Sequence, residues 1–454
     1  MGEKEKLTKE ELLEKAKEPA KKAMEWHPFY KGKIEVSPKV QIKSFDDFGV
    51  WYTPGVAKPC EDIAENPEMV YEHTNKWNNV AVVSDGSRVL GLGDIGPEAG
   101  MPVMEGKGLL FKYLGGVDAF PICMNAHDPD EIVQAVKWIA PSFGGINLED
   151  ISKPKCFYVL DRLREELDIP VWHDDQQGTA AITLAGIING LKVVGKELDQ
   201  VEIGLIGSGA ANLCLARTLL KAGVPEENLM LCDSTGLLHP GRDDLDKKTT
   251  PEKWKFAQKT NKQQKEGGIP ELIEGKDVVV AASAPGPDTI KKKWLKEMND
   301  DGILFAEANP IPEIWPWEAK DAGVRIVGTG RSDFPNQINN SIGFPGIFRG
   351  TLDVRAKTIS DEMHIEAAYA IAEVAEERGL DEDSLVPTME NTEVYVRQAV
   401  RVGLKAIEQG LARRELSEEE LRERAEKTIE SSRNKTQHMM DSGFIEEAPD
   451  VDLS

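Results

Sequence analysis

The hydrophobic and polar positions alternate most regularly in the second half of the chain. Short apolar runs there predict strands at 201–206, 229–232, 277–282, 302–306 and 324–327. Helical patterns lie between the runs, among them 213–222, which ends at Gly223. Strands and helices that alternate over about 130 residues are typical of a parallel, doubly wound sheet. This part of the chain therefore predicts an open α/β fold of the Rossmann type.

The region before it mixes similar elements with proline- and glycine-rich loops. We expect strands at 80–84, 118–122 and 170–172, helices at 130–138 and 157–166, and a glycine-rich loop over 86–108. The segment 179–194 has apolar residues at helical spacing and predicts a buried helix. We place a domain boundary near the start of this helix.

Polar and amphipathic segments complete the organisation. Residues 3–25 predict a surface helix of an N-terminal arm, and the polar stretch 243–268 predicts a surface excursion. Residues 353–435 are mostly amphipathic helix and are expected to pack back on the first domain. The predicted fold class is α/β, with a first α/β domain over 1–176, a dinucleotide-binding domain over 177–352 and a C-terminal helical segment over 353–454.

The charge balance narrows the classes of partner. The chain has 79 acidic and 55 basic residues, a formal net charge of -24. Such a field repels nucleic acid and anionic membranes, so we expect neither as a partner. Five scattered cysteines without a CxxC pair fit a reducing compartment and offer no zinc framework. No signal peptide or membrane-spanning apolar run stands out, so we expect a cytoplasmic protein.

The stretch 201–223 combines a strand, a glycine turn and a helix. Such a turn lets backbone N–H groups and the helix N-terminus approach a pyrophosphate. Asn212 stands at the third position of the fingerprint, where Gly or Ala is usual. The alternative interpretation is a turn that only packs a helix on a strand. We predict nucleotide contacts from Gly207, Ser208, Gly209, Ala210 and Ala211.

An acidic residue closes the next strand. Asp233 lies 26 positions after Gly207, where the ribose diol is expected. A carboxylate there bonds a free 2′-hydroxyl and repels a 2′-phosphate, which favours NAD over NADP. Arg242 or a lysine from the 243–268 excursion could reverse that preference.

Two pairs of neighbouring acids lie in the first domain, Glu149-Asp150 and Asp174-Asp175. Each is expected near the end of a strand or in the loop beyond it, where α/β sheets place ligand sites. An all-oxygen set suits a hard cation, Mg²⁺ or Mn²⁺, and not zinc. Neighbouring acids in loops are more often solvated surface charge or helix caps, and spacing alone does not separate these interpretations.

Six longer motifs connect these pieces. They are WYTPGVA, SRVLGLGDIGPEAGMPVMEGKG, GGINLEDI, HDDQQGTA, EANPIPEI and NQINNSIGFPGIFRG. In this order they resemble the malic enzymes, and the chain is similar to the short prokaryotic type over about residues 40–405. Taken alone, Tyr52 would be a packing residue and Lys107 a solvated surface lysine.

The resemblance implies a role for each residue that matches a motif. Tyr52 matches the general acid and Lys107 the general base, with Asp174 beside the lysine. Glu149, Asp150 and Asp175 match three ligands of a divalent metal. Arg88 matches a clamp on a substrate carboxylate. Two amides, Asn309 and Asn340, match groups that bind substrate near the nicotinamide, and Asn309 also counts among the expected nucleotide contacts.

The activity implied is conversion of L-malate and NAD(P)⁺ into pyruvate, CO₂ and NAD(P)H, by at least a dimer. Two alternatives use the same residues: malolactic conversion with retained NAD, and oxidation of another 2-hydroxy acid without loss of CO₂. A third alternative is a protein that binds the dinucleotide without catalysis, although both Lys107 and Tyr52 are present.

Overall fold

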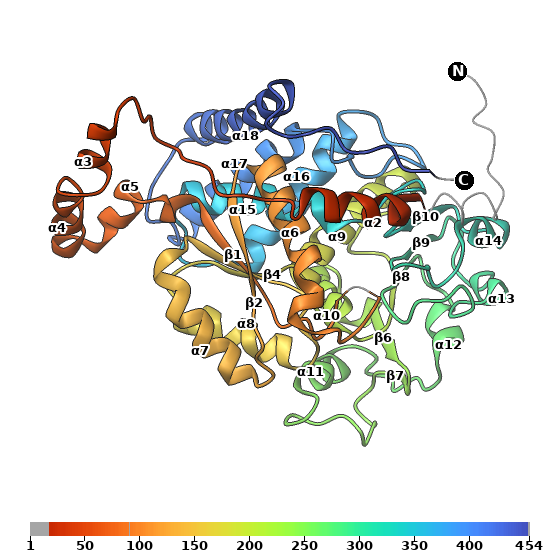
Figure 1. Ribbon diagram of the computed structural model, residues 1–454. Helices are drawn as coiled ribbons and strands as arrows, with labels where there is room; N and C mark the ends of the chain where they lie inside the picture. The colour runs from red at the N-terminus through yellow and green to blue at the C-terminus, as the bar shows by residue number, and fades with distance from the viewer. Residues whose placement is uncertain (1–17, 90, 453–454) are drawn as a thin grey trace.

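A computed structural model describes residues 18–89 and 91–452. Two separate parallel sheets form the body of the molecule, and helices cover both of them (Figure 1). Most of the helix expected over 3–25 lies outside the described residues. Within them, α2 (Glu18–Tyr30) is helical.

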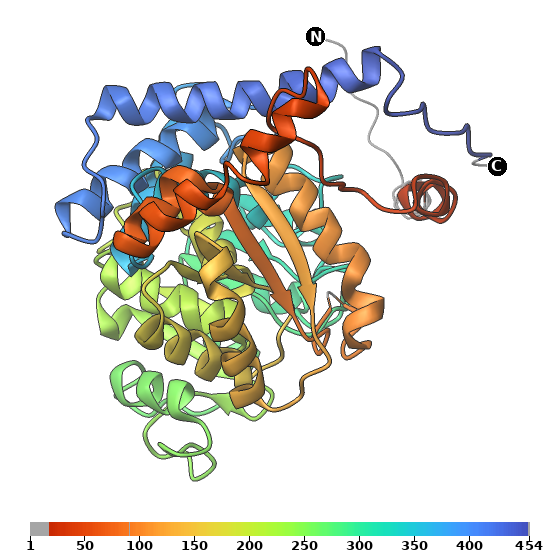
Figure 2. The same ribbon diagram turned by 60° about the vertical axis from the view of Figure 1, so that its left-hand side comes forward.

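The first sheet has the strand order β2-β1-β3-β4, with bounds Asp118–Cys123, Asn79–Ser84, Gly145–Leu148 and Val171–His173. Alternate side chains of β1 point to opposite faces. Those of Val80 and Val82 share a core with α6 (Gly96–Gly115) and α15 (Phe344–Asp353). Those of Ala81 and Val83 share a core with α7 (Pro129–Ile139) and α8 (Lys155–Glu166). Figure 2 shows β1 and β2 side by side with α6 along them.

The second sheet has the order β10-β9-β8-β5-β6-β7, with bounds Ile326–Thr329, Ile303–Ala306, Val278–Ala281, Ile203–Ile206, Leu229–Asp233 and Gly236–Leu237. All neighbours are parallel except β7, which pairs antiparallel with β6. One face packs on α9 (Thr179–Val194) and α10 (Ala210–Lys221). The other packs on α12 (Ile269–Ile273), α13 (Lys292–Leu295) and α14 (Pro316–Asp321). The predicted doubly wound fold is confirmed.

The glycine-rich loop predicted over 86–108 is wrong in its second half, because α6 begins at Gly96 and runs for 20 residues. Its glycines lie where the helix approaches other backbone. A Cβ on Gly108 would be 3.2 Å from the carbonyl oxygen of Ala119 in β2, and one on Gly115 would be 2.7 Å from that of Pro345. Close packing offsets the low helix propensity of glycine. The short strand β3 was not predicted either.

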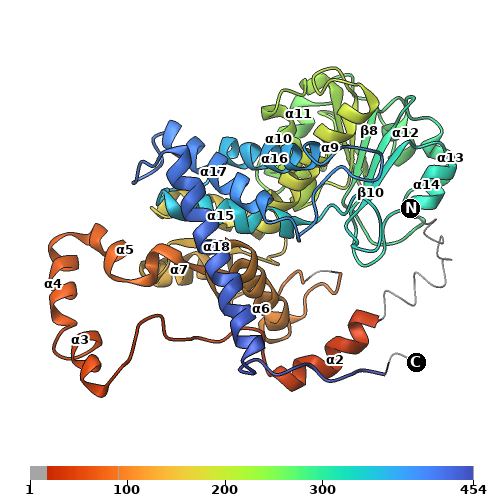
Figure 3. The ribbon, with the colours of Figure 1, turned by 90° about the horizontal axis from the view of Figure 1, so that it is seen from above.

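The C-terminal helices pack back on the first domain, as predicted, and also on the second. They are α16 (Asp361–Glu376), α17 (Glu393–Glu408) and α18 (Glu418–Asp441), and α18 crosses α6 in Figure 3. Val400 of α17 lies in the core of the first sheet, whereas Ala368 of α16 lies in that of the second. The predicted boundaries at 176 and 352 stay predictions.

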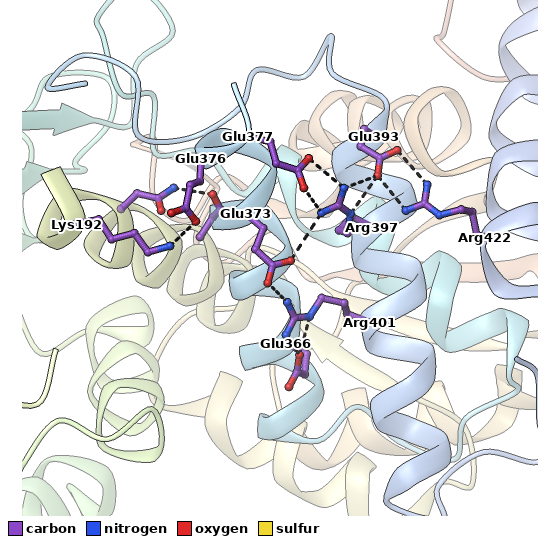
Figure 4. Close-up of polar contacts among 11 residues, drawn as sticks. Lys192, Glu366, Glu373, Glu376, Glu377, Glu393, Arg397, Arg401 and Arg422 are labelled. Atoms are coloured by element: carbon purple, nitrogen blue, oxygen red, sulfur yellow. Dashed lines mark hydrogen bonds and ion pairs between the residues drawn. The ribbon is translucent and has the colours of Figure 1, made fainter. Parts of the chain in front are cut away.

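Ion pairs link the outer surfaces of these helices (Figure 4). Arg397 of α17 pairs with Glu377 at 2.8 Å and with Glu393 at 3.1 Å, and Arg422 of α18 also pairs with Glu393. Arg401 pairs with Glu366 and Glu373 of α16. Each exposed ion pair of this kind contributes little to folding stability. We therefore interpret the network as orienting the helices more than stabilising the fold.

The segment over residues 45–73, which continues the N-terminal arm beyond the predicted helix, extends away from this body. It carries α3 (Phe48–Trp51), α4 (Ala57–Glu65) and α5 (Val70–His73), and α3 and α4 lie apart from both sheets in Figures 1 and 3. The segment predicted as a surface excursion contains α11 (Pro251–Lys259), whose Phe256 is buried. Within the described part of the chain, no helix combines the length and apolarity needed to cross a membrane.

Candidate active site

A buried lysine meets the carboxyl ends of two strands of the first sheet. Leu148 of β3 pairs with His173 of β4, so the residues that follow them, Glu149 and Asp174, leave the sheet side by side. Lys107 reaches them from α6. Its Nζ lies 2.6 Å from Asp174 Oδ2 and 2.9 Å from Glu149 Oε1. Without the family resemblance, the sequence predicts a solvated surface lysine at position 107. In the structure the Lys107 residue is only 7% exposed.

Neighbouring side chains fix this arrangement. The indole Nε1 of Trp172 donates to Asp174 Oδ1 at 3.0 Å, and Asn147 Nδ2 donates to Glu149 Oε2 at 2.9 Å. The ring of Phe344 lies 4.3 Å from Lys107 Nζ, in cation–π geometry. These three supporting residues were not predicted, because each stands in an ordinary apolar or polar pattern.

Negative charge exceeds positive charge in this cluster. The backbone N–H of Asp150 donates to Asp175 Oδ2 at 2.9 Å, which adds two more acids beside Glu149 and Asp174. Burial opposes the charge of Lys107, but Asp174 and Glu149 together hold the pKa of its ammonium above the ordinary value. Burial, with the repulsion of the other three acids, raises the pKa of Glu149 well above its usual range despite the attraction of Lys107.

The donor chemistry of the predicted metal ligands suits a hard cation. Glu149 and Asp150 are buried carboxylates, and an added divalent ion would relieve the excess negative charge that raises the pKa of Glu149. As the side chains lie, however, no three His, Cys, Asp or Glu groups among the described residues are arranged to hold a metal ion. Glu149 instead faces Lys107.

The predicted substrate residues lie around this cluster. The backbone N–H of Arg88 donates to the carbonyl oxygen of Asp150 at 3.0 Å. Asn340 lies against the segment after Asp174, since a Cβ on Gly178 would be 3.1 Å from its Cβ. Asn309 contacts the loop that carries Arg88, because a Cβ on Gly91 would be 2.8 Å from its carbonyl oxygen. These contacts bring the loops of both domains together.

Tyr52 stands apart from the other predicted residues. It lies at the end of α3 on the N-terminal arm and is 72% exposed. The arm and α6 are well separated in Figures 1 and 3. Within one described chain, the predicted general acid and general base are therefore not brought together.

The glycine turn has the geometry of a phosphate-binding loop. Gly207 has φ of 96°, and a Cβ there would lie 2.5 Å from the carbonyl oxygen of Ala282. Gly209 has open space beside it and precedes α10, whose first residues are Ala210 and Ala211. Ser208 is buried.

Asn212 explains the departure from the usual fingerprint. Its Nδ2 donates to the carbonyl oxygens of Ile206 and Gly207, both at 2.9 Å. The amide therefore satisfies two backbone acceptors of the turn, which an alanine or glycine at this position would leave to other donors.

A buried carboxyl group follows β9 and was not predicted. Thr183 Oγ1 donates to Glu307 Oε1 at 2.7 Å, and burial raises the pKa of Glu307 to about 8. It precedes Asn309 by two residues in EANPIPEI, so its place at a strand end was the available signal.

A doubly wound dinucleotide fold, joined to a buried lysine–carboxylate cluster at the end of a second sheet, defines a two-domain, dinucleotide-dependent α/β enzyme. The model of the malic enzyme N-terminal domain matches residues 31–164, and that of the malic enzyme NAD binding domain matches 176–320 and 322–407. The chain belongs to the malic enzyme family.

Individual relatives agree with this assignment. The NAD-dependent malic enzyme of Geobacillus stearothermophilus is 51% identical, with 85% of this chain and 78% of the relative covered. The bifunctional malic/malolactic enzyme of Bacillus subtilis (strain 168) is 46% identical, with 89% and 97% covered. The crystal structure of Entamoeba histolytica malic enzyme has a TM-score of 0.95 at 44% identity and covers 98% of this chain and 93% of its own.

Two glycine substitutions separate folding from nucleotide binding. Gly209→Ala places its methyl group in open space, so we expect thermal unfolding to stay unchanged while the Kd for NADH rises roughly tenfold or more. Gly207→Ala forces a side chain against Ala282 at positive φ and should cost about 1–3 kcal/mol of folding stability. NADH fluorescence and thermal unfolding measure both effects. Unaltered NADH affinity in folded Gly209→Ala would contradict the assignment of the turn.

Proposed function

We propose that the chain catalyses oxidative decarboxylation of L-malate to pyruvate and CO₂ with reduction of NAD(P)⁺. The observation that carries the proposal is the buried Lys107 between Asp174 and Glu149 at the sheet edge, in a chain whose glycine turn at 207–209 leads into α10. A nicotinamide nucleotide, which the turn from Gly207 to Ala211 would hold, would supply the acceptor for hydride from C2 of malate. A divalent ion, which Glu149, Asp150 and Asp175 would hold, supplies stabilisation of negative charge on substrate oxygens.

Lys107 is the proposed base for the C2 hydroxyl. In the described arrangement it is charged, because two carboxylates raise its pKa. To act as a base, Lys107 must lose its contact with at least one of these carboxylates, so that its pKa falls. Glu149 is the carboxylate that also belongs to the proposed set of metal ligands. Asp174 is held by Trp172 and stays beside the amine, so we assign it to orienting Lys107. Arg88 would bind a substrate carboxylate, and Asn309 and Asn340 would position the substrate.

Tyr52 is the proposed acid that protonates C3 of the enolate of pyruvate, and it acts from a second copy of the chain. A general acid must come within hydrogen-bond reach of the atom it protonates, directly or through one water. Tyr52 is exposed on an arm that also exposes Phe45, Phe48, Val50 and Trp51. Contiguous apolar side chains of this size mark an interface, and two-fold dimers are the commonest homo-oligomers.

Malolactic conversion is the second candidate, because the Bacillus subtilis relative is named as a bifunctional malic/malolactic enzyme. In the first outcome NADH is released from the enzyme. In the second it stays bound and returns its hydride to pyruvate. Incubation with malate, Mn²⁺ and each nucleotide, followed by quantification of pyruvate, lactate and oxaloacetate, distinguishes them. Pyruvate formed in equal amount to NAD(P)H supports the primary proposal, and lactate without net NADH formation supports the second.

Replacement of Lys107 should abolish the proton transfer without removing the nucleotide site. Lys107→Arg keeps a cation between the acids but cannot deprotonate, so malate oxidation should fall roughly 10²–10⁴-fold. The control is Lys112→Met on the same helix, which removes a half-exposed partner of Asp118. Initial rates and NADH affinity are measured together. Malate turnover near that of Lys112→Met would remove Lys107 from the mechanism.

A mixed dimer tests whether Tyr52 acts across the interface. Chains with Tyr52→Phe and with Lys107→Arg are co-expressed with different tags, and the heterodimer is isolated on both. If each site takes its tyrosine and lysine from different chains, one of the two sites is intact and about half of the activity returns. Both homodimers serve as inactive controls. A heterodimer as inactive as they are would place both residues of a site on one chain.

Metal binding can be measured without turnover. Mn²⁺ is titrated calorimetrically into the chelator-treated protein, and Asp175→Asn should weaken its binding at least roughly tenfold. Glu131→Gln, an exposed acid on α7, is the control for loss of charge. EDTA should stop malate oxidation, and Mn²⁺ or Mg²⁺ should restore it. Equal Mn²⁺ affinity in both variants would contradict the ligand assignment.

A further inference from the structure

The expected ribose-binding acid, Asp233, is already fully engaged. Its Oδ1 accepts hydrogen bonds from Arg242 Nη1 at 2.8 Å and from the backbone N–H of Thr235 at 3.0 Å. Its Oδ2 accepts from Lys253 Nζ at 2.6 Å and from Arg242 Nη2 at 3.3 Å. A carboxylate offers about four acceptor sites, so none remains for a ribose hydroxyl unless a cation leaves.

Both cations come from the segment after β7 that folds over the end of β6. Arg242 is nearly buried and pairs with Asp244 through both carboxylate oxygens, Nε with Oδ1 at 2.9 Å and Nη2 with Oδ2 at 2.5 Å. Its Nη1 also donates to the carbonyl oxygen of Gly236 at 3.1 Å. All donors of the guanidinium are thus engaged, and the half-exposed Asp244 is the partner that an incoming phosphate would replace. Lys253 stands on α11, is more exposed than Arg242 and pairs with Asp233.

A third cation, Lys153 of the first domain, interacts electrostatically with the same groups. Burial, and then the positive charge of Lys253, lower the pKa of Lys153, while Asp233 raises it. Arg242 and Lys253 both contact Asp233, so once Asp244 is displaced from Arg242 two cations face one acid. This excess suits a dianion better than a neutral hydroxyl, and a guanidinium fork matches the geometry of phosphate oxygens.

We propose that Arg242 and Lys253 form the subsite for the 2′-phosphate of NADP, with Asp233 holding the two cations in place instead of binding a ribose hydroxyl. Asp233 at the end of β6, taken alone, favours NAD, and its contacts reverse that expectation. The inference deepens the proposed function by naming its nucleotide, and it predicts that NADP supports malate oxidation at least as well as NAD.

The direct probe is 2′,5′-ADP, with ADP as the matched ligand that lacks the 2′-phosphate. Calorimetric titration of the full chain should show tighter binding of 2′,5′-ADP. Arg242→Gln and Lys253→Gln should each lower its affinity roughly 10–100-fold relative to ADP, the cost of a lost charge-assisted hydrogen bond. The control is Lys255→Gln on the same helix, which pairs with Glu252 on the surface.

Asp233→Asn separates the two interpretations of the acid. If Asp233 binds the ribose diol, this variant loses affinity for NADH far more than for NADPH. If it only holds the cations, NADPH binding is retained or improved, because a negative charge near the phosphate is removed. Equal binding of ADP and 2′,5′-ADP by the wild type, or a selective loss of NADH in Asp233→Asn, would overturn the proposal. Neither binding measurement needs malate turnover. Failure of this inference can therefore be distinguished from failure of the proposed reaction.

Discussion

A buried ammonium group that must be paired organises the first domain. Lys107 is almost removed from water, and an unpaired charge in that position would cost several kcal/mol or more. Two parallel strands supply the partners, since Glu149 and Asp174 leave the ends of β3 and β4 together. The glycines of α6 matter for the same reason. They let the helix approach β2 and α15 closely enough for its lysine to reach the sheet edge.

Most of the fold could be predicted from the sequence because buried strands and helices each have a characteristic spacing of apolar residues. The helix at 179–194 and the strands of the doubly wound sheet were found this way. The two failures have different causes. Helix α6 has glycines and a proline that locally favour a loop, and only its packing partners, distant in sequence, make it a helix. The strand β3 includes Gly145 and the polar Asn147, so it lacks the continuous apolar run that marked the strands of the second sheet.

The residue types of the candidate site could be predicted from the sequence, but the contacts between those residues could not. Acids at strand ends indicated a ligand site, yet the ion pairs of Lys107 could not be inferred from spacing, because Asp174 lies 67 residues from Lys107 in the chain. Tyr52 shows a different limit. Its motif indicates a role, but the side chain is exposed on an arm, and the proposed function needs a second copy of the chain that a single sequence does not describe.

Both candidate sites use the same electrostatic device, which suits a chain of net charge -24. Each sets cations against fixed acids: Lys107 against Asp174 and Glu149, and Arg242 with Lys253 against Asp233. In such a cluster a fixed acid holds the cations in place and prevents them from attracting anions indiscriminately. At Arg242 the acid that a ligand would replace is the half-exposed Asp244, while Asp233 keeps both cations in position. A hydroxyl cannot replace a carboxylate as a partner for a guanidinium, whereas a phosphate can.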